Sequence, residues 1–501
     1  FLPAYIILTG ASPSVVRAGL MMLIVLLFSR RGENKYWSAM DGISIVFCFY
    51  LFCQPYIIYH IAFQLSFLVT FFLILSGRLL KKYSSSYLFF LASVTFVSQL
   101  ASIPVLLWNF YEISLFSFIV NIFYVPLYSA IVLPALLMLF VAHLLFGKMA
   151  DPLLSLAELF FSLLNNGTKG LAQLPFSTLV IGKPSLLFLI LFLVSIFYFF
   201  FQWEKRGKFP ARHLPFIAGL FFIRLALGAF SVYGEVTMID VGQGDSIFIR
   251  LPFNRGTYLI DTGGVLQFET EEWEKRRQTF DPGKDILLPY LKSKGIRTID
   301  KLIITHGDAD HAGGAIALLK ELAVREIVMP DVSEKSDLEK GIIAVSEQKG
   351  IPVRFAKRGD KWTSGEHVFA VLAPEKGGNG SKNDQSIVIY SEIGGLRWLF
   401  TGDLEEDGEK KLLARYPSLK VDVLKVGHHG SKTSTSEPFL EAYKPRVALI
   451  SAGENNRFGH PHNEVVERLK KRNAAIFRTD EDGAITYRFK GKSGTFFTQI
   501  P

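Results

Sequence analysis

Thr305-His306-Gly307-Asp308-Ala309-Asp310-His311 is the stretch that decides the fold of the second half of this chain, because it places four potential metal ligands within six residues. It directly follows the apolar run Leu302-Ile303-Ile304, which predicts a buried strand, so we expect the ligands on the loop at the carboxyl end of that strand. The side chains of a tight turn point in different directions, and such a loop can surround two cations. The alternative, a solvated acidic loop with two histidines, loses weight because ligand-type residues recur further along the chain.

Ligand-type residues also follow three other short β-rich runs. They are Asp261, Asp403 and the pair His428-His429, each within two residues of a glycine. Ligands at the ends of separate strands would collect along one edge of a sheet. A binuclear site needs this convergence of histidine nitrogens and carboxylate oxygens, with one carboxylate bridging the two ions.

The spacing around His306 resembles that of the metallo-β-lactamase fold, an α/β fold of the αββα sandwich type whose usual signature is His-x-His-x-Asp-His. This chain has Asp308 where most members carry histidine. An additional carboxylate shifts the preference of a site from zinc toward harder ions such as manganese or magnesium. The resemblance therefore implies two divalent metal ions, with manganese or zinc as the first expectation and magnesium as an alternative.

The same resemblance implies how the ligands divide between the two ions. The first ion takes His306 and Asp308, the second takes Asp310 and His311, and Asp403 bridges them. Either His428 or His429 completes the site, and the sequence does not choose between them. The family's third-motif histidine is absent, and the segment 383–386 takes its place. Asp384 or Asn383 is then a weak ligand, or that metal is loosely held.

A site of this kind suits phosphoester chemistry. Two metals polarise a bound water to hydroxide near neutral pH and clamp a phosphoryl or acyl oxygen during in-line attack. The segment 430–436, Gly-Ser-Lys-Thr-Ser-Thr-Ser, favours phosphate, because its hydroxyls, backbone donors and cation suit anionic oxygens. We predict that Ser431, Lys432 and Thr433 bind substrate, the alternative being an ordinary polar loop.

The segment Gly459-His460-Pro461-His462 is a further candidate for the site. His460 can donate a proton to the leaving group. With Asp310 it forms the predicted pair of catalytic residues, while His462 is predicted to bind substrate. The alternative interpretation is a turn at the entry of a helix, with Asn463 as the N-cap.

The first half of the chain has the composition of a membrane domain. Residues 1–232 contain six acidic residues against fifteen Lys and Arg, so this half carries the whole net charge of +9, and residues 233–501 are balanced. We predict a polytopic α-helical membrane domain over 1–232, with about seven to eight spans, followed by the metallo-β-lactamase-like domain over 233–501. The candidate spans lie near 14–29, 41–58, 61–77, 86–108, 114–146, 184–202 and 213–231.

Two apolar segments do not fit a single ordinary crossing. The segment 114–146 is too long, and Asn121, Pro126 and Pro134 predict two half-helices or a span with a re-entrant piece. The segment 153–174 is interrupted by polar residues and glycines, which predicts an interfacial or pore-lining position.

Charged and polar residues predict an orientation and a polar route. The basic clusters at 30–35 and 205–212 are expected on the cytoplasmic side, so the single crossing near 213–231 would put the metal domain outside. Arg17, Gln64 and Asn121 lie inside predicted spans and are candidates for lining a channel. The alternative for each is a hydrogen bond between helices.

Both halves resemble one family. The motifs at 9–21, 62–67 and 121–127 resemble the membrane competence domain of ComEC-type DNA-uptake proteins, and Ile-Asp-Val-Gly-Gln-Gly-Asp-Ser at 239–246 resembles the metal domain of the same family. The resemblance implies a multi-pass protein of the bacterial cytoplasmic membrane that passes one DNA strand during natural transformation. Its metal domain would act as a nuclease on the other strand. An external DNA receptor and a cytoplasmic helicase-like motor are the implied partners, and a homo-oligomer stays open.

Three further expectations follow. Because the chain starts at Phe1 without the family's earlier spans and small β-barrel domain, we expect a C-terminal fragment of a longer protein. A membrane-anchored hydrolase of another phosphoester, such as a nucleotide or a lipid headgroup, is a second functional hypothesis. The third is a DNA-binding module with a degenerate metal site, since the third-motif histidine is lost.

Overall fold

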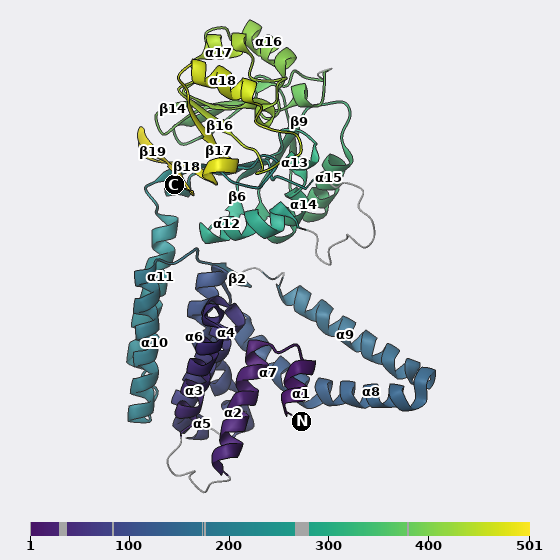
Figure 1. Cartoon of the computed structure of the whole chain (residues 1–501), viewed down its shortest axis with the longest axis vertical. Helices are drawn as coiled ribbons and strands as arrows, with labels where there is room; N and C mark the ends of the chain where they lie inside the picture. Colours follow the sequence, from purple (N-terminus) through teal and green to yellow (C-terminus); the bar gives the residue numbers. More distant parts are fainter. Residues whose placement is uncertain are drawn as a thin grey trace. The chain divides into compact units, whose positions relative to one another are not determined.

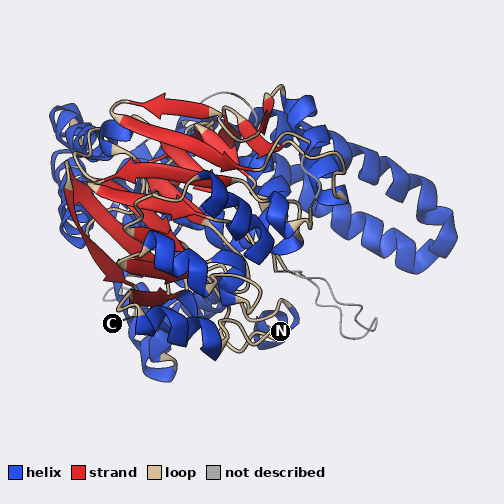
Figure 2. Cartoon of the chain, turned by 90° about the horizontal axis from the view of Figure 1, so that it is seen from above, coloured by secondary structure: helices blue, strands red, loops and turns tan. Residues whose placement is uncertain are grey.

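The computed structural model describes residues 2–29, 38–82, 85–172, 174, 177–265, 280–377 and 380–500. The chain forms two compact units, Phe1–Leu225 and Ala226–Pro501. The first unit is helical, and the second contains two large β-sheets (Figures 1 and 2). The basic cluster predicted at 30–35 lies outside the described residues.

The first unit consists mainly of helices (Figure 1), and many of them are apolar. Among the described residues, four helical stretches are long and apolar enough to cross a membrane: Tyr87–Asn109, Ser117–Phe146, Leu186–Arg206 and Ala211–Gly228. Three shorter apolar helices precede them, and each of the seven predicted spans overlaps one of these helices. The helices of this unit are α1 (Leu2–Leu8), α2 (Pro13–Ser29), α3 (Ala39–Cys53), α4 (Ile61–Leu75), α5 (Gly77–Lys82), α6 (Tyr87–Asn109), α7 (Ser117–Pro126), α8 (Leu133–Phe146), α9 (Asp151–Ala172), α10 (Leu186–Arg206) and α11 (Leu214–Ala229).

The predicted break of the segment 114–146 into two half-helices is wrong, whereas the interfacial or pore-lining position of 153–174 stays a prediction. A π-helical turn, Leu127–Val132, joins α7 to α8, so the backbone stays helical from Ser117 to Phe146. Such a turn accommodates the amide hydrogen bonds that Pro126 and Pro134 lack. Helix α9 likewise continues through the polar segment 165–170. None of the α9 side chains that the structure describes is buried within the unit.

Polar side chains join some of these helices. Arg17 of α2 donates from Nε to Ser66 Oγ at 2.7 Å and from Nη1 to Thr70 Oγ1 at 2.5 Å, both on α4. Asn109 at the end of α6 donates to Gln64 Oε1 at 3.2 Å. Of the three channel candidates, Arg17 and Gln64 thus make the helix–helix hydrogen bonds that were the alternative interpretation. Asn121 lies on α7.

The second unit is built on two twisted sheets (Figure 2). The first sheet has the strand order β10-β9-β7-β5-β4-β3-β18-β19, and the second has the order β11-β12-β13-β14-β15-β16-β17. The strands of the first sheet are β3 (Gly234–Met238), β4 (Ile247–Arg250), β5 (Thr257–Ile260), β7 (Lys301–Ile303), β9 (Ile327–Pro330), β10 (Val353–Ala356), β18 (Ile485–Lys490) and β19 (Ser493–Thr498). Those of the second are β11 (Lys361–Ser364), β12 (His367–Ala373), β13 (Val388–Ile393), β14 (Leu396–Phe400), β15 (Val423–Lys425), β16 (Val447–Ile450) and β17 (Ala475–Arg478).

Successive side chains along each strand point to opposite faces of its sheet, so one face packs against the other sheet and the other packs against helices. This arrangement is an αββα sandwich. On β4, Ile247 and Ile249 enter the core between the sheets, whereas Phe248 packs on the opposite face against helices. The helices that cover this outer face of the first sheet are α12 (Leu288–Ser293), α14 (Ala315–Glu321) and α15 (Asp337–Lys349). The outer face of the second sheet is covered by α16 (Glu406–Arg415), α17 (Glu437–Tyr443) and α18 (Asn463–Lys471). The predicted fold class, a helical membrane-type half followed by an α/β metallo-β-lactamase-like half, is confirmed.

The direction of the strands determines where the functional loops meet. In the first sheet β5 pairs parallel with β7, and in the second sheet β14 pairs parallel with β15. Parallel neighbours end at the same edge of a sheet, so the loops after β5 and β7 lie together, as do those after β14 and β15. These four loops carry the ligand-type residues singled out in the sequence.

A helix cap fixes the loop that follows β7. At the start of α15, Ser336 and Glu339 form a capping box, in which the Glu339 amide donates to Ser336 Oγ and the Ser336 amide donates to Glu339 Oε2. The Ser336 hydroxyl also donates to the Gly307 carbonyl at 2.9 Å. A Cβ at Gly307 would lie 2.4 Å from Ser336 Oγ. Glycine is therefore required at this point of the loop.

We expect Ser336→Ala to lower the free energy of unfolding of the second unit by about 1 kcal/mol, because the helix loses its cap. The loop should also become more susceptible to protease, because Gly307 loses its hydrogen bond. Pulse proteolysis of the full chain in urea, followed on the fragment of the second unit, measures the change. Ser418→Ala, at an exposed loop serine, is the matched control. Equal midpoints for both variants would contradict this prediction.

Candidate metal centre

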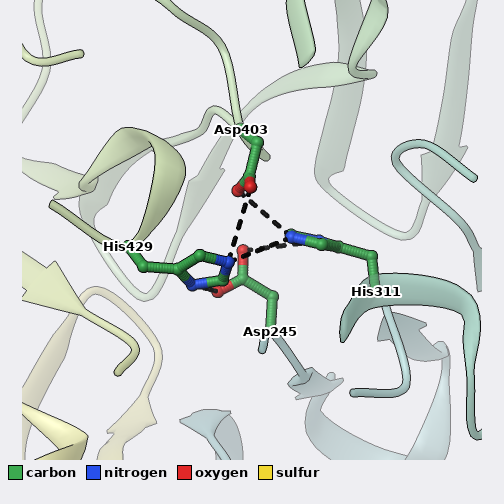
Figure 3. A group of neighbouring side chains, drawn as sticks. All are labelled: Asp245, His311, Asp403 and His429. Atoms are coloured by element: carbon green, nitrogen blue, oxygen red, sulfur yellow. Dashed lines mark hydrogen bonds and ion pairs between the residues drawn. The ribbon is translucent and has the colours of Figure 1, made fainter. Parts of the chain in front are cut away.

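Four buried residues, Asp245, His311, Asp403 and His429, bring potential ligand atoms within 4.8 Å of one another (Figure 3). His311 lies on α13 (Ala309–Ala312), in the loop after β7. Asp403 follows β14, and His429 follows β15. Asp245 comes from the loop between β3 and β4. Residues far apart in the sequence thus meet at one edge of the sandwich.

The distances within this group match those between ligands of a metal ion. His311 Nε2 lies 3.2 Å from Asp403 Oδ1 and 3.3 Å from His429 Nε2. His429 Nε2 lies 3.4 Å from Asp403 Oδ2 and 3.3 Å from Asp310 Oδ2. Two ligand atoms that are each about 2.0–2.1 Å from a tetrahedral ion are separated by roughly 3.3 Å. Two imidazole nitrogens that face each other between carboxylates therefore fit a divalent cation.

The other ring nitrogen of each imidazole is held by an acceptor. His311 Nδ1 is 2.8 Å from Asp261 Oδ2, and His429 Nδ1 is 2.9 Å from the Ser451 carbonyl oxygen. Asp261 is fixed in turn by Thr305, whose amide and hydroxyl both donate to its carboxylate at 2.7 Å. Acceptors at Nδ1 select the tautomer that presents Nε2 to a metal.

Asp245 lies on the Nδ1 side of both imidazoles. Its carboxylate oxygens are 3.4 Å from His429 Nδ1 and 3.8 Å from His311 Nδ1. The preceding residue, Gly244, has φ of +127°, and a Cβ there would lie 2.2 Å from the Asp310 carbonyl oxygen. The close approach of these two backbones requires glycine. Asp245 stood in the quoted 239–246 motif, but nothing in its local spacing marked it as part of the site.

Lys425 places a cation inside this acidic cluster. Its side chain is 1% exposed, forms an ion pair with Asp245, and lies 3.6 Å from Asp403 Oδ1. Its ammonium group also donates to the Gly402 carbonyl at 2.8 Å. The sequence showed it only as one polar residue in the strand run before His428. The one feature of the sequence that could have indicated its role is the presence of a lysine within an apolar strand.

The charges perturb the protonation of the whole cluster. Burial alone would lower the pKa of His311, but the Asp403 and Asp261 carboxylates outweigh burial and hold it well above its ordinary value. His429 behaves in the same way, through Asp403 and Asp245. Burial would raise the pKa of Asp245, yet Lys425 and His429 lower it to about 2. Without an ion, protons on the two histidines balance the carboxylates.

His306 and Asp308 mark a second position beside the first. His306 Nε2 is buried without a hydrogen-bond partner and lies 3.8 Å from Asp308 Oδ2. Burial and the nearby His311 lower the pKa of His306 to about 3, so its imidazole is neutral at neutral pH. A buried, neutral and unpartnered ring nitrogen facing a carboxylate also fits a divalent cation.

The segment that replaces the third-motif histidine presents a hydroxyl, not the predicted carboxylate. Ser386 Oγ lies 3.4 Å from His306 Nδ1 and accepts from the Asp403 amide at 3.2 Å. Asp384 Oδ1 instead accepts from the amides of Glu405 and Gly408 at 3.2 and 3.0 Å, and so caps α16. The expectation that Asp384 is a metal ligand is therefore replaced by a capping role.

His428 and His429 occupy different environments. His429 is in the buried group, whereas the His428 side chain is 25% exposed and its Nε2 lies 3.9 Å from Asp403 Oδ2. Both residues have a positive φ, 47° and 54°, which L-residues other than glycine rarely adopt. His428 Nδ1 lies 3.1 Å from Glu405 Oε1. The sequence left the choice between the two histidines open, and the geometry favours His429 as the ligand.

The Ser/Thr segment forms a rim beside His428. Thr433 Oγ1 donates to Glu405 Oε1 at 2.8 Å and lies 3.1 Å from Ser431 Oγ. Ser434 is buried and donates to the Gly427 carbonyl, so it shapes the loop. Lys432 is exposed and lies 3.5 Å from Glu464. Part of this segment is thus structural. The sequence did not predict that the Glu405 carboxylate would hold Thr433 and His428 in place.

His460 approaches the same rim. Its ring centroid is 5.6 Å from that of His428 and 6.3 Å from that of His429. Burial, reinforced by the neighbouring histidines, lowers its pKa to about 4. His462, whose ring lies 5.2 Å from His460, occupies the N-cap position of α18 without a side-chain cap bond. Asn463 is the first residue of α18, so its predicted role as the N-cap is wrong.

Each half of the chain matches a known protein family. Residues 1–206 match the Competence protein family, and residues 239–454 match the Metallo-beta-lactamase superfamily. Over 512 residues the chain is 39% identical to ComE operon protein 3 of Bacillus subtilis (strain 168), in an alignment that covers 100% of this chain and 64% of the relative. Recombination protein 2 of Haemophilus influenzae is 28% identical, in an alignment that covers 97% of this chain and 62% of the relative.

These matches define a competence domain joined to a metallo-β-lactamase domain. The chain is a homologue of the ComEC-type competence proteins, as its motifs predicted. It spans a little under two thirds of the length of these two relatives. Among solved structures, the metallo-beta-lactamase fold protein YhfI from Bacillus subtilis matches with a TM-score of 0.34 and 10% identity, over 51% of this chain and 99% of YhfI.

We expect Lys425→Met to lower the free energy of unfolding of the second unit by about 3–5 kcal/mol, because it leaves buried carboxylates without their cation. Asp245→Asn removes the opposite partner. The double variant Asp245→Asn/Lys425→Met should be less destabilised than the sum of the single variants, because neither charge is then left alone. Urea unfolding followed by pulse proteolysis measures all three. Additive losses would show that the two residues do not stabilise each other.

Proposed function

We propose that this chain takes part in DNA uptake across the cytoplasmic membrane of a bacterium, and that its second unit is a metal-dependent nuclease acting on the strand that is not imported. The observation that carries the nuclease proposal is the convergence of His311 Nε2, His429 Nε2, Asp310 and Asp403 within 3.2–3.4 Å of neighbouring ligand atoms. Homology to competence proteins supports the uptake role.

The donor set supports two divalent ions. Asp310, His311, Asp403 and His429 would hold one, and His306 and Asp308 would hold the other, with Asp403 between the two positions. This mixture of carboxylates and imidazoles is compatible with manganese or zinc, and with magnesium as an alternative. The second position has fewer protein donors, since Ser386 stands where a histidine is usual, and it should bind its ion more weakly.

The residues around the ions would divide the work of phosphodiester hydrolysis. The ions supply charge stabilisation and a water of lowered pKa. Asp310 faces the centre and would orient the attacking water, while Ser431, Lys432 and Thr433 would receive phosphate oxygens at the rim. Because burial lowers the pKa of His460 to about 4, its imidazole is neutral near pH 7 and carries no extra proton to give to a leaving group. We therefore assign His460 as a hydrogen-bond acceptor in place of the predicted acid.

The first unit would supply the passage for DNA. Its apolar helices are compatible with a multi-pass membrane protein. The basic cluster at 205–212 supports a cytoplasmic loop, and the second unit would then lie on the external face. In that arrangement an external DNA receptor would deliver the duplex, and a cytoplasmic helicase-like motor would draw in the surviving strand.

Metal binding should release protons, because the pKa values of His311 and His429 are raised and both imidazoles must be neutral to bind an ion. The apparent affinity for manganese should therefore fall as the pH is lowered. Isothermal titration calorimetry of the full chain in detergent, in two buffers of different ionisation enthalpy, should show about two protons released for the first ion bound. His429→Ala should reduce this release to about one proton, that of His311, and His367→Ala, at a partly exposed histidine on β12, should leave it unchanged. Heats independent of the buffer would contradict the assignment.

The nuclease proposal is tested with the full chain purified in detergent and stripped of metal. Labelled single-stranded and duplex DNA are incubated with manganese, magnesium or zinc. We expect metal-dependent cleavage that falls by at least about 100-fold in Asp403→Asn, because a ligand to both ions is weakened. Asp407→Asn, at an exposed acid of α16, is the matched control. Hydrolysis of small phosphodiesters without cleavage of DNA would favour the membrane-anchored phosphoesterase instead.

A further inference from the structure

An exposed aromatic ring stands beside the candidate metal centre and has no role in the chemistry described so far. Phe458, in the loop between β16 and α18, is 45% exposed. Its neighbour toward the site is His460, which lies in turn beside the histidines after β15. A large apolar side chain at the rim of a charged, phosphate-binding site calls for a ligand that has an apolar face as well as an anionic group.

Phe458 continues a series of rings that starts at the metal centre. The ring of His460 is inclined by 23° to that of buried His429, with centroids 6.3 Å apart. The ring of Phe458 is inclined by 24° to that of His460, with centroids 5.7 Å apart. The phenyl ring therefore stacks roughly parallel to the His460 imidazole, which stacks in the same way on His429. One ring, that of His460, lies between Phe458 and the histidine that faces the ion position.

The loop that carries Phe458 is tied down at both ends. Asn456 donates from Nδ2 to the carbonyl oxygens of Gly453 and His460, at 2.8 and 2.5 Å, and its Oδ1 accepts from the His460 amide at 3.0 Å. The Gly453 amide donates to Gln243 Oε1 at 3.2 Å, which joins the loop to the β3–β4 connection. The backbone on either side of Phe458 is thus held in place, which lowers the entropic cost of ordering this loop when a ligand binds.

We propose that Phe458 stacks on the nucleobase next to the scissile phosphate, so that the second unit acts on unpaired nucleotides of a single strand. The inference rests on the proposed nuclease function and names its substrate class. An aromatic side chain stacks on any base, because every base has a π-face, and stacking is worth roughly 1–3 kcal/mol per base. In a duplex both faces of an internal base are already covered, so single strands and frayed ends are the preferred substrates.

The test is a cycle between the ring and the base. The substrate is a single-stranded oligonucleotide with one cleavable phosphodiester, flanked by either a thymine nucleotide or an abasic nucleotide. We measure kcat/KM at that linkage for the full chain and for Phe458→Ala. Each single change should lower kcat/KM by about tenfold or more, and the two together should cost no more than one alone. Phe458→Trp should retain the rate on the thymine substrate. Phe497→Ala, at an exposed ring on β19, is the matched control.

Three outcomes separate the inference from the proposal beneath it. Losses that multiply would overturn the inference, because the ring and the base would then act independently. An unchanged rate in Phe458→Ala would overturn it as well, and would leave the ring free to contact another partner. If the unsubstituted chain cleaves neither substrate with any of the three metals, the nuclease proposal itself fails.

Discussion

Lys425 places an ammonium group among carboxylates in the interior of the second unit, and the candidate metal centre depends on that charge. Asp245 and Asp403 are both almost fully buried, and each contacts Lys425. Moving a carboxylate out of water costs several kcal/mol, which a nearby cation offsets. A permanent cation lets the fold keep this acidic cluster before any metal arrives. Protons on the His311 and His429 imidazoles supply the remaining positive charge, and a metal ion can replace these protons.

The two sheets convert this charge cluster into a site. Parallel pairing within each sheet brings the ends of β5 and β7 together, and likewise the ends of β14 and β15. The apolar core between the sheets keeps these two sets of loops facing each other. Glycines then let the backbones approach, as at Gly244, where a Cβ would meet the Asp310 carbonyl. The imidazoles are consequently fixed at Nδ1 by groups from other loops, with Nε2 left for the ion.

The parts of the site that could be predicted from the sequence are those whose residues lie close together along the chain. The loop after β7 was recognisable because four ligand-type side chains lie within six residues, directly after an apolar strand. Asp245, Lys425 and Glu405 were missed because their roles arise only from tertiary contacts. Lys425 lies in a run of strand residues, and Glu405 follows Asp403 without a metal-ligand spacing. In the first unit, hydropathy predicted the positions of the helices. The break predicted from the prolines of 114–146 is absent, because a π-helical turn joins α7 to α8.

The capping box at the start of α15 also bears on how this region opens. Ser336 and Glu339 cap the helix, and the same serine hydroxyl holds the Gly307 carbonyl in the loop that carries His306 and Asp308. One serine side chain therefore links the first turn of α15 to the loop after β7, and we expect the two to open together. Their amide hydrogens should exchange with solvent together and be protected together. The order of the loop is thus coupled to the fraying of a helix that contributes no ligand.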